Sequence, residues 1–182
     1  TVQGVRTQPG EVNYFTTPRR ISMIGLDFET YCELDLRKVG LDRYISHPSF
    51  AVLLATIQYE SGQQQLIDFV LEADAWETLA AALEYVEGFA AHNAPFELAV
   101  LNKIEIVPPQ RVVDTAVIAR IQGGASKLEH AAPQLLDHAQ KIPAGQRLIR
   151  KFSMAATKPT LETVENDPDW TLFREYALVD AS

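Results

Sequence analysis

The amino-acid sequence predicts an α/β fold, a mixed five-stranded sheet with helices on its faces. The first part of the chain has three β-rich runs, and a Ser61-Gly62 turn between the second and the third indicates an antiparallel meander. The spacing of apolar residues then becomes helical, and two further short β-rich runs interrupt it. The expected order is therefore three antiparallel strands followed by α-β-α-β-α.

Apolar spacing and turn residues set the expected boundaries. Strands are expected at residues 22–30, 50–59, 65–69, 89–92 and 111–115. Helices are expected at residues 73–87, 94–102, 116–122, 127–136 and 168–182, and residues 137–160 are expected to be less regular. Asn93 and Asp167 are expected to cap helices, each with a proline in the first turn, and Gly88 is expected to end the helix before it.

The first strand separates apolar from acidic side chains. Ile24, Leu26 and Phe28 point to one face, whereas Asp27 and Glu29 point to the other. If this strand is central, the meander lies on one side of it and the fourth and fifth strands lie on the other. The carboxyl ends of the first and fourth strands then border the crevice where open α/β sheets bind ligands.

Four polar residues are expected to converge at this crevice. Asp27 and Glu29 end the first strand, and Asn93 and Glu97 follow the fourth. Burying an unpaired charge is costly, and a divalent metal would supply a partner for the two acids. The alternative is a strand end at which both carboxylates reach water. For Asn93 and Glu97 the alternative is a structural role at a helix N-terminus, where the helix dipole favours an anion.

Tyr176 and Asp180 form a third motif, because residues four apart are neighbours on one face of a helix. A phenol and a carboxylate placed in this way can act on the same water. A half-buried tyrosine on an amphipathic helix is the simpler explanation of this motif taken alone. Phe96 is expected in the core, with base stacking as its other use.

Composition limits the classes of function. The 182 residues fit one domain, 47% of them are hydrophobic, and no apolar run is long enough to span a membrane. The single cysteine, Cys32, excludes a disulfide and a cysteine-based zinc site within one chain, and it indicates a reducing, cytoplasmic setting. The net charge of -8 argues against coating nucleic acid by bulk electrostatics but is compatible with a carboxylate metal site.

Charge and periodicity vary along the chain. Residues 141–158 carry five cations and no acid, for which a solvated loop face is the simplest explanation. Residues 1–20 are expected to be an N-terminal arm and residues 21–182 the domain itself. Because the sequence stops within a strong helical pattern, we expect it to be a piece of a longer polypeptide.

The order of the three motifs is more specific than any one of them. An acid-x-acid pair, an Asn-x-x-Phe-acid segment and a Tyr-x-x-x-Asp segment occur in turn, which resembles the tyrosine branch of the DEDD superfamily of 3′→5′ exonucleases. The histidine branch has a histidine just before the position of Tyr176, where this chain has Glu175. The chain is also similar to the proofreading domain of phage-type family A DNA polymerases at residues 35–44, 47–50, 113–115 and 147–153.

This resemblance implies a ribonuclease H-like fold and two divalent metal ions, Mg²⁺ or Mn²⁺. By motif position, Asp27 would bridge both ions, and Glu29 and Asp180 would hold one of them. Glu97 would hold the other ion, in part through water. Tyr176 would orient the attacking water.

The resemblance also implies contacts with the substrate. Thr30 and Asn93 would contact the terminal nucleotide of a single-stranded DNA 3′ end. The basic segment would then bind the DNA backbone through Arg147, Arg150 and Lys151.

The implied function is removal of nucleotides from single-stranded DNA 3′ ends, as proofreading for a polymerase domain in the same polypeptide or complex. A phage protein of this kind would act in the host cytoplasm. An RNA exonuclease similar to ribonuclease D and a non-catalytic module of the same fold are the alternatives. The chain departs from the superfamily at Glu97, where aspartate is usual. The extra methylene could move the second metal or add a bridging water, and this bears on the choice between an active exonuclease and a non-catalytic module.

Overall fold

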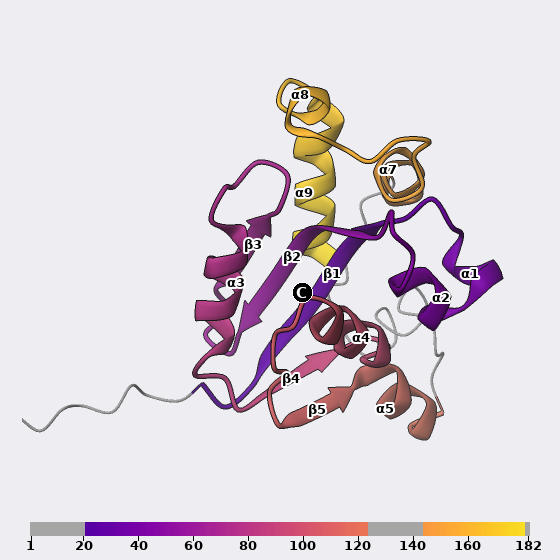
Figure 1. The fold of residues 1–182 in the computed structure, drawn as a ribbon. Coiled ribbons are helices and arrows are strands. Elements are labelled where there is room, and N and C mark those ends of the chain that lie inside the picture. Colours follow the sequence, from indigo (N-terminus) through magenta and orange to yellow (C-terminus); the bar gives the residue numbers. More distant parts are fainter. Residues whose placement is uncertain (1–20, 124–143, 181–182) are drawn as a thin grey trace, which may run out of the picture.

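The computed structural model describes residues 21–123 and 144–180, and within them the centre is a five-stranded sheet (Figure 1). The strands are β1 (Ile24–Tyr31), β2 (Ala51–Tyr59), β3 (Gln64–Asp68), β4 (Gly88–Ala91) and β5 (Arg111–Asp114). Their order is β3-β2-β1-β4-β5, with β2 antiparallel to β1 and β3, and with β4 parallel to β1 and β5. The predicted fold class and the central position of the first strand are confirmed.

The two faces of the sheet bury separate apolar clusters. Ile24, Leu26 and Phe28 of β1 pack against α2 (Leu41–Ile45), α3 (Ala75–Leu83) and α4 (Pro95–Lys103). On the opposite face, Tyr31 of β1 packs with α7 (Gly145–Phe152), α8 (Leu161–Val164) and α9 (Pro168–Asp180). Figure 1 shows these last three helices grouped together, with α9 running along the sheet toward β1. Asp27 and Glu29 therefore share the face that α9 covers, because alternate residues of a strand point the same way.

The remaining helices connect or flank these layers. They are α1 (Leu36–Val39), between β1 and β2, and α5 (Thr115–Ile121), directly after β5. Among the residues that the structure describes, no helix is both long and apolar enough to cross a membrane.

A bulge in β2 lies opposite the end of β1. Glu29 pairs with Leu54 but Thr30 pairs with Val52, so Leu53 has no partner on β1. As a result, Leu53 and Leu54 are consecutive residues that both pack into the cluster beneath α9. The extra residue bends the strand and adds apolar surface to the face that carries Glu29.

The structure corrects the expectation of less regular backbone at residues 137–160 for the part of this range that it describes, residues 144–160. Residues Gly145–Phe152 form α7, with Leu148 and Phe152 buried one turn apart. The apolar residues of this segment are spaced as on one face of a helix, a signal that the surrounding cations obscure. The helix expected at residues 127–136 lies outside the described residues.

A second correction concerns the helix expected at residues 73–87. Helix α3 ends at Leu83, because Val86 forms a bridge with Ile21 and the N–H of Glu87 bonds to the Ile21 carbonyl at 2.9 Å. Gly88 therefore begins β4 instead of ending a helix. Pairing with a distant segment overrides the local helical pattern at these residues.

Candidate active site

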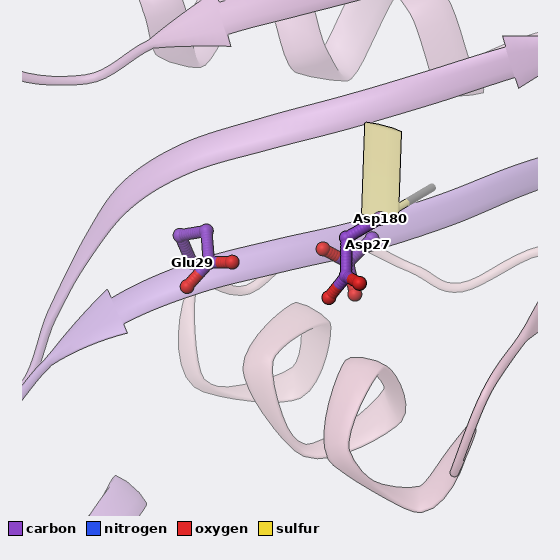
Figure 2. Close-up of side chains that lie close together, drawn as sticks. All are labelled: Asp27, Glu29 and Asp180. Atoms are coloured by element: carbon purple, nitrogen blue, oxygen red, sulfur yellow. The ribbon is translucent and has the colours of Figure 1, made fainter. Parts of the chain in front are cut away.

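Three carboxylates from two elements meet on the face of the sheet that α9 covers. Asp27 and Glu29 project from β1, and Asp180 is the last residue of α9 (Figure 2). One oxygen of each lies within 4.8 Å of the others, close enough for all three to hold one cation. The structure thus brings together three of the four acids that the sequence singled out.

Helix α9 delivers Asp180 to this cluster. The Asp167 carboxylate accepts a hydrogen bond of 2.9 Å from the N–H of the second helical residue, as expected of the predicted cap. Trp170, Phe173 and Ala177 recur at intervals of three and four residues and are buried. This face packs on β1, β2 and β3, so the last turn of the helix reaches β1.

Tyr176 lies one turn before Asp180, and its hydroxyl donates a hydrogen bond of 3.0 Å to Asp180 Oδ2. Its ring stacks parallel to that of Phe173, with the centroids 6.2 Å apart. Burial, followed by the charges of Glu29 and Asp180, raises the pKa of the phenol above its ordinary value. The group is therefore protonated at neutral pH and acts as a hydrogen-bonding group rather than as a base.

The clustered acids destabilise one another's charged forms. Burial, with a contribution from the charge of Asp180, raises the pKa of Asp27 to about 7. Burial and the charges of Asp27 and Asp180 raise the pKa of Glu29 well above its ordinary value. A cation placed among these oxygens would favour their charged forms, because an opposite charge within a few ångströms lowers the pKa of a carboxyl.

Glu97 lies beside this cluster rather than in it. It projects from the first turn of α4, is only 2% exposed, and has one oxygen, Oε2, without a hydrogen-bond partner. Burial, followed by the charges of Asp27 and Asp114, raises its pKa to about 9. An unpartnered carboxylate oxygen at this depth needs either a proton or a cation to compensate its charge.

The turn before Glu97 differs from the prediction that Asn93 caps a helix. The capping position of α4 belongs to Ala94, which makes no side-chain cap. Asn93 instead has a positive φ of 76°, and its N–H donates to Asp114 Oδ1 at 3.2 Å. The same oxygen accepts from the N–H of Ala116 at 2.9 Å, so Asp114 joins this turn to the start of α5. Sequence reasoning gave Asp114 no role, although an aspartate directly before an apolar helical run is a capping signal.

Thr30 and Phe96 meet around Tyr44. The hydroxyl of Thr30 is buried and lies 3.0 Å from that of Tyr44. The half-buried Phe96 ring tilts toward the same tyrosine, with the centroids 6.4 Å apart. The expected contacts of Thr30 and Phe96 with a nucleotide remain predictions.

Three cations of the basic segment, Arg147, Arg150 and Lys151, lie on α7, and two of them are paired with the start of α9. Arg147 makes two hydrogen bonds to Asp169, of 2.6 and 2.8 Å. Lys151 reaches both Asp167 and Asp169, at 2.6 and 2.8 Å. Arg150 is exposed and makes no ion pair within the described part of the chain. Arg150 could therefore bind a phosphate directly, whereas Arg147 and Lys151 would first have to leave their carboxylate partners.

Comparison with known proteins finds DNA polymerases among the proteins that this chain resembles. No family model matches the chain. It is 31% identical over 169 residues to the DNA polymerase of Bacillus phage SP02, an alignment that spans 86% of this chain and only 26% of that protein. The structure resembles that of a family B DNA polymerase from the archaeon Pyrobaculum calidifontis, with a TM-score of 0.51, 10% identity, and coverage of 90% of this chain and 23% of that one. Brucella melitensis NrnC gives a TM-score of 0.45 at 17% identity, over 88% of this chain and 67% of that one.

The strand order and the helices on both faces define a ribonuclease H-like fold, with an acidic cluster between the central strand and α9. The chain shares this fold with a solved DNA polymerase and is similar in sequence to part of a phage DNA polymerase.

Proposed function

We propose that this domain is a metal-dependent 3′→5′ exonuclease that shortens single-stranded DNA 3′ ends and proofreads for a DNA polymerase in the same polypeptide or complex. The observation that carries the proposal is the meeting of Asp27, Glu29 and Asp180, from a strand and a helix far apart in sequence. The similarity to a phage DNA polymerase supports the polymerase setting.

The donor set fits hard divalent cations such as Mg²⁺ or Mn²⁺, because every candidate ligand atom is a carboxylate oxygen. The unpartnered Oε2 of Glu97 supports a second ion beside the first. We assign one ion to Asp27, Glu29 and Asp180, and the other to Asp27 and Glu97, in part through water. Two such ions, when bound, would supply activation of a water and stabilisation of the leaving 3′ oxygen.

The protein's own contribution at the reacting water is Tyr176. Its phenol stays neutral, and its hydroxyl is already directed at the cluster by the hydrogen bond to Asp180. In this proposal the hydroxyl orients the attacking water, while the carboxylates bind the metal ions. No covalent nucleophile is required.

The substrate contacts divide into two groups. Asn93 is exposed at the carboxyl end of β4 and would contact the terminal nucleotide, beside Phe96. Because the Thr30 hydroxyl is buried, Thr30 would contribute through its main chain. On α7, Arg150 would meet the DNA backbone directly, and Arg147 and Lys151 would exchange a carboxylate for a phosphate, since ion pairs at a surface are weak.

The test is degradation of a 5′-labelled single-stranded DNA and a matched RNA, with Mg²⁺ or Mn²⁺, and with EDTA as the control for metal dependence. We expect a ladder that shortens from the 3′ end and forms faster on DNA. Asp27→Ala is expected to remove activity together with most metal binding. The matched control is Glu77→Ala, which removes an exposed acid on α3, away from the cluster, and is expected to keep wild-type activity.

Each outcome discriminates among the functions. A ladder that forms faster on RNA would favour the ribonuclease D-like function. A folded wild-type protein without activity on either substrate would favour the non-catalytic module, and isothermal titration with Mn²⁺ would then show weak binding or none. Near-normal turnover in a folded Asp27→Ala variant would overturn the site assignment.

A further inference from the structure

Gly145, the first residue of α7, lies directly against the ring of Tyr176. A Cβ added at Gly145 would lie 2.5 Å from Cε2 and 2.9 Å from Cδ2 of this ring. Favourable carbon–carbon contacts are about 3.5–4.0 Å, so neither distance is tolerable without movement. All three of the nearest atoms belong to Tyr176.

The backbone does not require glycine at this position. Gly145 begins a regular helix and is not among the described glycines with positive φ, which are Gly40, Gly62 and Gly123. Alanine is the better helix former. The tyrosine ring, rather than the backbone conformation, therefore accounts for the absence of a side chain here.

The ring has little freedom to move aside. Its hydroxyl is hydrogen-bonded to Asp180, and the face of the ring stacks on Phe173. Gly145 is itself buried, and α7 packs against α9 along this line. A side chain at residue 145 would therefore displace the phenol from Asp180 or push the two helices apart.

We propose that Gly145 is a positioning residue for the exonuclease reaction: its missing side chain leaves the space in which the Tyr176 ring holds its hydroxyl at Asp180. This inference rests on the proposed function. It gives α7 a role in the reaction, because the start of this helix sets the position of the group that orients the water.

The test uses Gly145→Ala in the full chain, with kcat, KM and Mn²⁺ affinity measured separately. We expect kcat to fall by about 100-fold, the size of loss that a misplacement of roughly 1 Å can cause, while KM and Mn²⁺ affinity stay at wild-type values. The double variant Gly145→Ala/Tyr176→Phe is expected to be no slower than Tyr176→Phe alone, because both changes act through one hydroxyl. Gln146→Ala, the exposed neighbour on α7, is the matched control and should keep wild-type kcat.

Crystal structures of the wild type and of Gly145→Ala give a readout that does not depend on activity. We expect the separation between the Tyr176 hydroxyl and Asp180 Oδ2 to increase beyond hydrogen-bonding distance in the variant. Wild-type kcat in Gly145→Ala, an unmoved hydroxyl, or a double variant whose losses multiply would each overturn the positioning role. A wild type without nuclease activity would instead overturn the proposed function and, with it, the catalytic meaning of Gly145, and the crystal structures would still show whether Gly145 positions the ring.

Discussion

Asp68 and Trp170 are joined by a buried hydrogen bond of 2.8 Å, in which the indole Nε1 donates to Asp68 Oδ2 across 102 residues of sequence. The other carboxylate oxygen accepts from two backbone N–H groups of the following turn, at 3.0 Å each, and Arg174 Nε lies 3.3 Å from Oδ2. Asp68 is fully buried at the end of β3, so it fastens α9 to the sheet. The helix that carries Asp180 is thus held in place by a carboxylate outside the acidic cluster.

Trp170→Phe is expected to lower the free energy of unfolding by about 1–3 kcal/mol, because it leaves Oδ2 of the buried Asp68 without its indole donor. Urea unfolding followed by circular dichroism measures this loss. Trp76→Phe is the matched control, since Trp76 is 45% exposed, and surface changes cost roughly 0.5 kcal/mol or less. Equal losses in the two variants would contradict the role given to the hydrogen bond.

Much of the fold follows from local patterns. The alternation of β1 is a property of neighbouring residues, and it correctly separates Ile24 and Leu26 from Asp27 and Glu29. The change from strand to helix spacing correctly predicts the element order on both sides of the central strand. Asp27 and Glu29 can be predicted to lie together because residues two apart on a strand point to the same face.

The parts that sequence reasoning missed depend on distant partners. Asn93 was expected to cap a helix because its neighbours favour one, but its conformation is held by Asp114 across the turn. The end of α3 is set by pairing with Ile21. Helix α7 was missed because its apolar residues are separated by cations, whose partners on α9 only the folded chain brings near.

Tyr176→Phe is expected to slow turnover by about 100-fold, within the range for residues that assist proton movements at a reacting water, and to leave Mn²⁺ affinity unchanged. The physical reason is that the hydroxyl is assigned to the water and not to an ion, and that Asp180 keeps both of its carboxylate oxygens in this variant. Single-turnover kinetics and isothermal titration with Mn²⁺ measure the two effects. Asp180→Ala is the comparison variant and is expected to lose both properties. A loss of Mn²⁺ affinity in Tyr176→Phe as large as that in Asp180→Ala would show that the phenol has a different role.

Without metal, the melting temperature is expected to be lower at pH 8 than at pH 5. Asp27 releases its proton near pH 3.8 in an unfolded chain and near pH 7 in the folded one, so the folded state binds more protons between these values. Stability therefore falls as the pH rises through this window. Glu29 and Glu97 act in the same direction, because their pKa values are also raised.

Saturating Mg²⁺ is expected to raise the melting temperature more at pH 8 than at pH 5, because ligand carboxyls must lose their protons to bind an ion. Differential scanning calorimetry with EDTA or with Mg²⁺ at both pH values measures the effect. Asp27→Asn, which cannot ionise, is the control and should reduce the pH dependence of the metal-free protein, leaving the part that Glu29 and Glu97 contribute. A metal-free wild type that is more stable at pH 8 than at pH 5 would contradict the raised pKa values that burial and neighbouring charges give these carboxyls.

Glu97→Gln separates the two proposed ions. In the metal-free protein at pH 7, Glu97 holds a proton, because its pKa is raised to about 9, so the neutral amide resembles the form already present. Metal-free stability at pH 7 is therefore expected to stay close to that of the wild type. Activity is expected to fall by more than about 10-fold, the lower end of the loss found for groups that support metal sites, because the amide supplies no charge to the second ion.

Glu97→Asp is the matched variant, since it keeps the charge but shortens the side chain by one methylene. It is expected to retain more activity than Glu97→Gln at every Mn²⁺ concentration, with a shifted requirement for metal. Mn²⁺ titrations are expected to show that Glu97→Gln keeps the binding event assigned to Asp27, Glu29 and Asp180 and loses the weaker one, because these three oxygens lie within 4.8 Å of one another without Glu97. Full activity in Glu97→Gln would mean that the second ion, if one binds, is held without this carboxylate.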